Sequence, residues 1–205
     1  MAEPGQLHRS AGMRWAGTVV WPTERGARIA STGLSAPSRP GERLLHRLAL
    51  ADVGLALEAA GRTILTEREA RSAEAVPGRP AELLAVPACA QAVHWPDLVL
   101  VPPGGPVVAV EVELTPKSRG ELRAILRAYQ RARRRVVYLG AAPVVRQLQG
   151  RPGSDGQWVD GVAQEAGLLP RGEPDPGAGG LLRVRPLVLT DPDVARQVGR
   201  HATRR

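Results

Sequence analysis

Three carboxylates stand at spacings that suit the binding of a cation and chemistry on a phosphate ester. Asp97 lies in the apolar run 94–101, and Glu111 and Glu113 lie in a second apolar run, 107–114, beyond a PPGGP turn. Strand side chains alternate between two faces, so Glu111 and Glu113 share one face. Carboxylates that face each other across a ladder destabilise it. A bound divalent cation is the simplest reason for placing three of them together.

The five-residue turn predicts the register of this hairpin. If residues 102–106 close it, Val99 pairs with Ala109, and Asp97 then falls opposite Glu111. The alternative is an ordinary exposed sheet face, on which acidic side chains are common.

Lys117 is the second chemical signal. It is the one lysine among 28 Lys and Arg residues, and it follows Glu113 by four positions. Arginine keeps its charge in proteins, whereas lysine is a compact point charge whose pKa can shift. A lysine kept beside the acidic cluster therefore favours a role there, although chance placement is the alternative.

Composition bounds the class of protein. A chain of 205 residues supports one core, and no run of 18 apolar residues predicts a membrane span. The first residues lack the apolar stretch of a secretory signal, so we expect a cytoplasmic protein. The single cysteine, Cys89, excludes an internal disulfide framework and a cysteine-based zinc site.

The net charge of +8 favours an anionic partner, and its distribution favours DNA. A basic segment follows the acidic cluster, with Arg119, Arg123, Arg127 and Arg131 at helical spacing. Arginines on such a face neutralise phosphates and release counterions. The alternative is a solvated helix face.

Periodicity and capping signals predict an α/β protein. Thr66–Glu69 and Ser118–Glu121 are capping boxes that open helices. The expected elements are a strand 18–21, a helix from Thr23, helix 42–60 with Gly61 at its C′ position, strand 62–65, helix 67–75, the hairpin, helix 119–134, strand 136–139, helix 143–149, a short helix within 159–166 and strand 181–189. Without the short helix after strand 62–65, the order from residue 42 is αβββαβ.

This order and these residues resemble the PD-(D/E)xK nuclease superfamily, whose restriction-endonuclease-like core is a mixed sheet flanked by helices. Pro96-Asp97 resembles the first half of its motif, and Glu111-Val112-Glu113 resembles the second half. Glu113 occupies the usual lysine position, which weakens the expectation of cleavage. Lys117 could supply the missing charge if it turns back into the site.

More specifically, the chain resembles actinobacterial members of the replication-relaxation family. Four stretches carry this resemblance: 20–26 (VWPTERG), 46–69, 94–97 (HWPD) and 111–129. The resemblance implies plasmid or mobile-element DNA as substrate, and replication or transfer proteins as partners. The expected domains are a disordered N-terminus (1–13), a winged-helix remnant (14–35), the nuclease-like core (42–149) and a Gly/Pro-rich extension with one late strand (150–205).

The resemblance also implies roles at the site. Asp97 and Glu111 would hold Mg²⁺ or Mn²⁺ with the backbone carbonyl of Val112. Glu113 would orient or deprotonate a water or bind a second metal, and Lys117 or an arginine would stabilise the charge that develops on the phosphate.

Two other residues are weaker candidates. His94 either contacts a phosphate or caps a strand, and Glu58 either faces the site from the first long helix or is solvated. The alternative functions are a non-catalytic DNA-binding accessory with a degenerate nuclease fold, and a protein–protein module.

Overall fold

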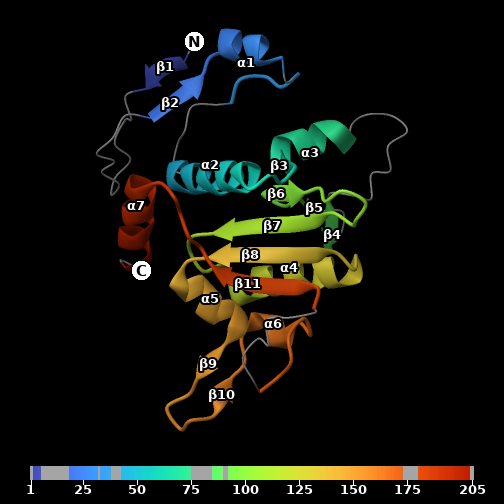
Figure 1. Cartoon of the computed structure of the whole chain (residues 1–205). Helices are drawn as coiled ribbons and strands as arrows, with labels where there is room; N and C mark the ends of the chain where they lie inside the picture. Colours follow the sequence, from blue (N-terminus) through green and yellow to red (C-terminus); the bar gives the residue numbers. More distant parts are fainter. Residues whose placement is uncertain are drawn as a thin grey trace.

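The computed structural model of the chain describes residues 2–5, 19–31, 33–37, 43–74, 85–89, 92–172 and 180–203. It is a mixed α/β structure around a five-stranded sheet in the order β11-β8-β7-β6-β3 (Figure 1). In chain order the elements are β1 (Ala2–Gly5), β2 (Val19–Pro22), α1 (Glu24–Ala30), α2 (Leu44–Ala59), β3 (Ile64–Thr66), α3 (Glu67–Glu74), β4 (Val86–Cys89), β5 (Ala92–His94), β6 (Leu98–Leu100), β7 (Val108–Glu113), α4 (Arg119–Arg131), β8 (Arg135–Gly140), α5 (Ala142–Gln149), β9 (Arg151–Pro152), β10 (Trp158–Val159), α6 (Val162–Glu165), β11 (Leu182–Pro186) and α7 (Pro192–Thr203). In the described part of the chain, no helix has both the length and the apolar character that a membrane crossing requires.

The central hairpin has the predicted register. β6 and β7 are antiparallel, and Val99 pairs with Ala109. β6 is shorter than predicted because it begins at Leu98, while His94 belongs to the separate strand β5. Asp97 therefore stands just before β6, and its backbone carbonyl accepts a hydrogen bond from the Glu67 N–H at 3.1 Å.

The sheet combines an antiparallel half and a parallel half. β3 pairs antiparallel with β6, and β6 pairs antiparallel with β7. After α4 the chain returns as β8, parallel to β7, and β11 then adds a further parallel strand beside β8. With α2 in front, the observed order is the expected αβββαβ, with α3, β4 and β5 inserted. The late strand β11 belongs to the same sheet, so the central unit extends past residue 149.

The capping residues fix where the helices around the site begin. Thr66 Oγ1 accepts from the Glu69 N–H at 3.3 Å, and the Glu69 carboxylate accepts from the Thr66 N–H at 2.8 Å, which is a complete capping box before α3. Ser118 Oγ accepts from the Glu121 N–H at 3.2 Å at the start of α4. The end of α4 differs from the prediction of residue 134, because Arg133 adopts a positive φ of 48°.

The C-terminal end of α2 follows the glycine prediction. Gly61 has φ +72°, and its N–H donates to the Glu58 carbonyl at 2.8 Å. Glycine populates this left-handed region without a Cβ penalty, so the helix ends here.

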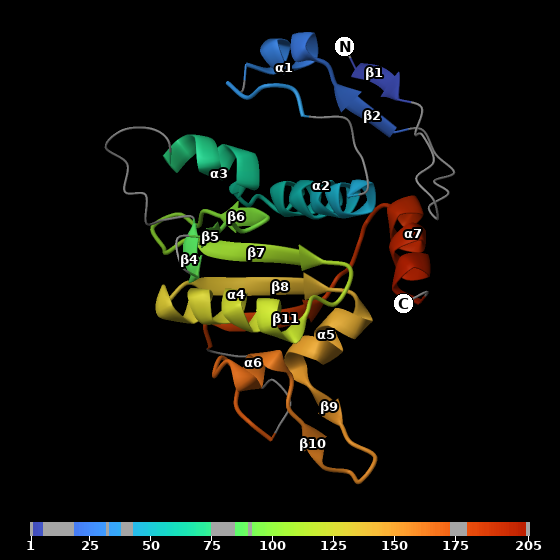
Figure 2. The ribbon, with the colours of Figure 1, turned by 180° about the vertical axis from the view of Figure 1, so that it is seen from behind.

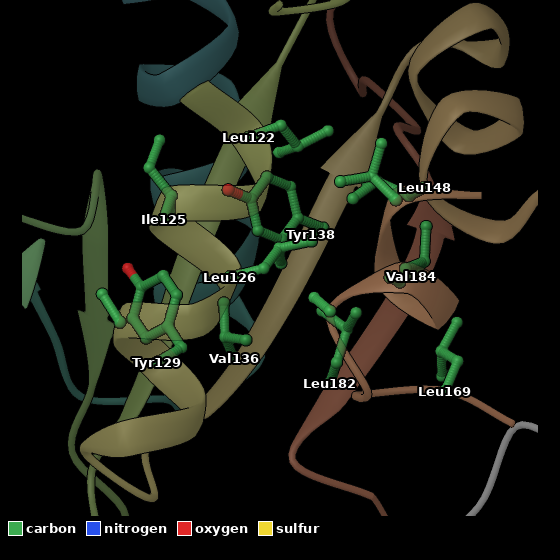
Figure 3. Close-up of a cluster of buried hydrophobic side chains, with 14 of the residues drawn as sticks. Leu122, Ile125, Leu126, Tyr129, Val136, Tyr138, Leu148, Leu169, Leu182 and Val184 are labelled. Carbon is green, nitrogen blue, oxygen red and sulfur yellow. The ribbon is translucent and has the colours of Figure 1, made fainter. Parts of the chain in front are cut away.

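Two apolar clusters hold the sheet between helices. One lies under α4, α5 and α6, where Leu122, Leu126 and Tyr138 are buried (Figure 3). Figure 2 shows α4 lying across β8 on that face. The second cluster joins α2 and α7 to the sheet through residues that include Leu45, Val110 and Val194. The sheet thus has a helix layer on each face.

Several segments differ from the sequence expectations. Residues 2–5 were expected to be disordered, yet they form β1 and pair with β2. The stretch 76–92 was expected to be irregular, yet its described part contains β4 and β5, an antiparallel pair with a register shift at Cys89. The polar tail after residue 191 forms α7. Residues 6–18, which include part of the expected winged-helix remnant, lie outside the described residues, as does the side chain of Cys89.

Candidate functional site

A cleft of about 490 Å³ opens where the start of α2, the body of α3 and the C-terminal end of β7 meet. It brings together residues separated by more than 70 positions in the sequence. The charged or aromatic side chains that line it are Arg43, His46, Glu67, Arg71, His94, Trp95, Asp97, Glu111, Glu113 and Lys117. All four catalytic residues predicted from the sequence are among them.

Asp97 is fixed by contacts on both of its side-chain oxygens. Oδ2 accepts a hydrogen bond from the Val112 N–H at 2.9 Å, across the hairpin. Oδ1 lies 3.4 Å from Nε2 of His46, which α2 supplies. The Asp97 side chain keeps 19% of its surface exposed, so it remains accessible from the cleft.

Glu111 is the buried carboxylate of the site, and 3% of the residue is exposed. Its Oε1 lies 2.7 Å from Nε2 of His94 and also accepts a hydrogen bond from the Tyr129 hydroxyl, which comes from α4. The rings of His94 and Tyr129 meet edge to face at 5.7 Å. Two side chains from different elements therefore orient one carboxylate oxygen.

Burial and pairing shift the pKa values of this trio. Burial raises the pKa of Glu111, and its contacts with His94 and Tyr129 offset part of that rise. Burial alone would lower the pKa of His94, but its hydrogen bond to Glu111 and the Glu111 charge outweigh this effect and raise it. Burial and the Glu111 charge place the pKa of Tyr129 well above its ordinary value, so its hydroxyl stays a proton donor.

Lys117 does return to the acidic cluster. Its ammonium group forms an ion pair with the Glu113 carboxylate, and the lysine side chain keeps 28% of its surface exposed. Its backbone is fixed as well, because Gln147 of α5 donates to the Lys117 carbonyl at 2.6 Å. The lone lysine therefore lies in the cleft beside Glu113.

The predicted DNA-binding arginines on α4 are not all exposed and unengaged. Arg119 and Arg123 both form ion pairs with Glu165 of α6. Arg131 donates to the Pro87 carbonyl at 3.3 Å, while Arg127 is exposed to solvent. None of the four lines the cleft.

Two other residues considered in the sequence lie at different distances from the cleft. Val112 is buried in the sheet, and its N–H fixes Asp97. Glu58 is exposed near the C-terminal end of α2, and at 1.5 Å per residue it lies about 18 Å along the axis from His46.

Several residues of this site were not predicted from the sequence. His46 of α2 and Tyr129 of α4 contact Asp97 and Glu111, and Arg43 and Glu67 also line the cleft. Arg71 and Trp95 pack together, with the guanidinium carbon 5.1 Å from the ring centroid. Of these residues, only Trp95 could be expected near the site from the sequence, because it adjoins Pro96-Asp97. The others come from elements that lie far from Asp97 along the chain.

The oxygen donors fit Mg²⁺ or Mn²⁺ in kind. Mg²⁺ is held in proteins by one or two carboxylates, with water and substrate phosphates as its other ligands. Asp97 and Glu111 supply two carboxylates, and the Val112 carbonyl lies between Glu111 and Glu113 on the same strand. Among the described residues, no three His, Cys, Asp or Glu side chains converge to hold a metal ion. A cation here would therefore depend on water and a phosphate for much of its coordination.

Comparisons with protein-family models, with curated proteins and with solved structures find no match to this chain.

Proposed function

We propose that this chain is a DNA-processing protein with a restriction-endonuclease-like PD-(D/E)xK core, and that its cleft is a metal-dependent phosphodiesterase site. The observation that carries the proposal is the position of Asp97 beside Val112 and Glu111, with the lone Lys117 paired to Glu113 in the same cleft. In keeping with its resemblance to the replication-relaxation family, the protein would act on plasmid or mobile-element DNA in the cytoplasm.

The strand order supports this class. An antiparallel β3-β6-β7 meander followed by α4 and a parallel β8 is the αβββαβ arrangement that the PD-(D/E)xK resemblance implies. Asp97 precedes the middle strand of the meander, and Glu111 lies on its third strand. These strand positions support the assignment of Asp97 and Glu111 to the two halves of the motif.

Each side chain of the cleft has a role in such a reaction. Asp97, Glu111 and the Val112 carbonyl would hold Mg²⁺ or Mn²⁺, whose chemistry is to polarise the phosphate and activate a water. The Glu113 carboxylate would orient that water or accept its proton. The Lys117 ammonium would stabilise the negative charge that grows on the phosphate oxygens. Tyr129 and His94 would keep Glu111 in one orientation.

The cationic side of the cleft suits a phosphate ester. The first turn of α2 lines the cleft, and the Arg43 side chain forms no capping hydrogen bond there. The N-terminal end of a helix favours an anion. Arg43, Arg71 and Lys117 add full positive charges around the acids, so the phosphate would be bound by charge and the acids would act on it.

One observation favours a second candidate, a non-catalytic DNA-binding accessory. Each acid already has a basic partner: Asp97 has His46, Glu111 has His94, and Glu113 has Lys117. Acids that already have such partners do not need a cation to hold them in place. The cleft would then bind DNA phosphates without cleaving them.

A cleavage assay with matched variants tests the proposal. Supercoiled plasmid and single-stranded circular DNA are incubated with the protein in Mg²⁺ or Mn²⁺, and calorimetry on the same samples measures cation binding. We expect Asp97→Ala to abolish cation binding and to lower cleavage by at least about 10²-fold, because the cation that stabilises the developing charge would no longer be held. Glu58→Ala, an exposed acid outside the cleft, is the control and should leave both unchanged.

The outcomes separate the candidates. If wild type neither binds the cation nor cleaves, while Asp97→Ala still binds DNA with a steep salt dependence, the accessory function replaces the enzyme. If the protein binds no DNA at physiological salt, both candidates are wrong and a protein–protein module remains.

A further inference from the structure

The Arg71 guanidinium is held in place from two directions. Trp95 lies under it, with 5.1 Å between the guanidinium carbon and the ring centroid. Glu67, one helical turn earlier on α3, accepts a hydrogen bond from Arg71 at 2.6 Å. Trp95 is itself half-buried and packs beside Ala70 and Val99. The Trp95 ring and the Arg71 guanidinium therefore form one wall of the cleft.

This supported guanidinium is turned toward the cleft. Arg71, Glu67 and Trp95 all line it, and 56% of the Arg71 side chain is exposed. Trp95 is separated from Asp97 by one residue, so the wall stands beside the acids of the site. A phosphodiester held at Asp97 would bring its own sugar and base close to Arg71.

A planar cation on an aromatic ring stacks well with a nucleobase. Unpaired bases stack on aromatic side chains and on arginine planes, and such stacking tolerates any base sequence. In a duplex the bases are stacked on one another and only their edges face the grooves. A wall of this kind can therefore stack on a base in a single strand but not on one inside a duplex.

We propose that the cleft takes an unpaired nucleotide of single-stranded DNA, with its base stacked on the Arg71 guanidinium that Trp95 supports. The inference rests on the proposed function of the cleft and names its substrate class. Arg71 is a specificity-determining residue, since it contacts the base while Arg43 and Lys117 supply positive charge for the phosphate. The cleft volume of about 490 Å³ lies within the range of pockets for small organic ligands.

Fluorescence anisotropy in EDTA tests this inference without cleavage. Three labelled DNAs of equal length are compared: a single strand, its duplex, and a single strand made of abasic residues. We expect wild type to prefer the normal single strand over the other two by about tenfold, which is the scale of stacking one base.

Arg71→Lys keeps the positive charge but loses the guanidinium plane. We expect this variant to lose about tenfold in affinity for the normal single strand and less than twofold for the abasic strand. Arg62→Lys, at an exposed arginine outside the cleft, is the matched control and should change neither. A melting temperature equal to that of wild type shows that Arg71→Lys is folded.

Two results would overturn the inference: duplex bound as tightly as the single strand, or Arg71→Lys with unchanged single-strand affinity. Its failure is distinct from failure of the proposed function. Cleavage that depends on Asp97 without any preference for single strands would leave the phosphodiesterase proposal intact. Base-dependent binding without any cleavage would leave this inference intact and favour the accessory.

Discussion

Among the residues that the structure describes, two carboxylates are buried, and their surroundings differ in kind. Asp52, on α2, accepts hydrogen bonds from the Thr190 N–H at 2.6 Å, from the Thr190 hydroxyl, and from the Asp191 N–H at 2.9 Å. Glu111, on β7, is contacted at its carboxylate by two titratable side chains, His94 and Tyr129.

The two pKa values move in opposite directions. Burial acts to raise the pKa of Asp52, but the hydrogen bonds from Thr190 and Asp191 outweigh it and lower the pKa. Burial also raises the pKa of Glu111, and there it prevails. A buried acid that accepts hydrogen bonds from fixed backbone donors thus stabilises the fold in its charged form. A buried acid beside titratable partners has a raised pKa instead, and it can exchange a proton or bind a cation.

The largest effect should come from deleting the structural acid. Asp52→Ala removes the three hydrogen bonds that this carboxylate accepts from Thr190 and Asp191, which tie α2 to the start of α7. We therefore expect the free energy of unfolding to fall by about 3 kcal/mol. Urea denaturation measures it. Glu58→Ala, an exposed acid on the same helix, should change it by less than about 0.5 kcal/mol. Equal effects of the two variants would contradict the contrast between the two acids.

Asp52→Asn tests whether the charge itself contributes. We expect the free energy of unfolding to fall by about 2 kcal/mol at pH 7. The amide lacks the negative charge, and its NH₂ group would face the donors of Thr190 and Asp191 instead of accepting from them. A lowered folded-state pKa contributes stability that is present above the unfolded pKa of about 3.9 and is lost as pH falls through the folded pKa. The difference between Asp52→Asn and wild type should therefore narrow below about pH 4 in denaturation curves. A difference that is constant with pH would show that the charge contributes nothing.

Glu111→Gln should have the smallest effect and the opposite sign. The folded-state pKa of Glu111 is raised, so its ionisation costs stability that grows as pH rises from the unfolded to the folded pKa. The raised pKa of His94 adds stability below about pH 6.5 that is also lost on raising the pH. We expect the variant to be more stable than wild type at pH 8 and to gain less at pH 5, because the amide carries no charge for burial to disfavour. A destabilised variant at pH 8 would show that Glu111 is as structural as Asp52.

The elements that depend on local signals were predictable. The PPGGP turn set the hairpin register, Thr66 and Ser118 set helix starts, and Gly61 set a helix end. Each of these signals depends on interactions between residues only a few positions apart, so it can be recognised in a single sequence. The placement of Asp97 near Glu111 followed from the same local register.

The partners of the acids were not predictable, because they come from distant elements. His46 approaches Asp97 across 51 positions, and Tyr129 approaches Glu111 across 18. Tyr129 lies within an apolar stripe of α4. Such a stripe does not distinguish a tyrosine that only packs in the core from one that also donates a hydrogen bond. The C-terminal α7 did leave a signal, since Asp191 precedes Pro192 and its carboxylate accepts from the Val194 N–H at 3.1 Å as an N-cap.

The Asp52–Thr190 contact also has a consequence for folding order. It joins residues 138 positions apart, and closing so long a loop comes late and slowly in folding. During synthesis from the N-terminus, α2 and the β6–β7 hairpin leave the ribosome long before Thr190 does. Until then the apolar side of α2 that later receives α7 stays uncovered. We therefore expect nascent chains to need protection from aggregation until synthesis has passed α7.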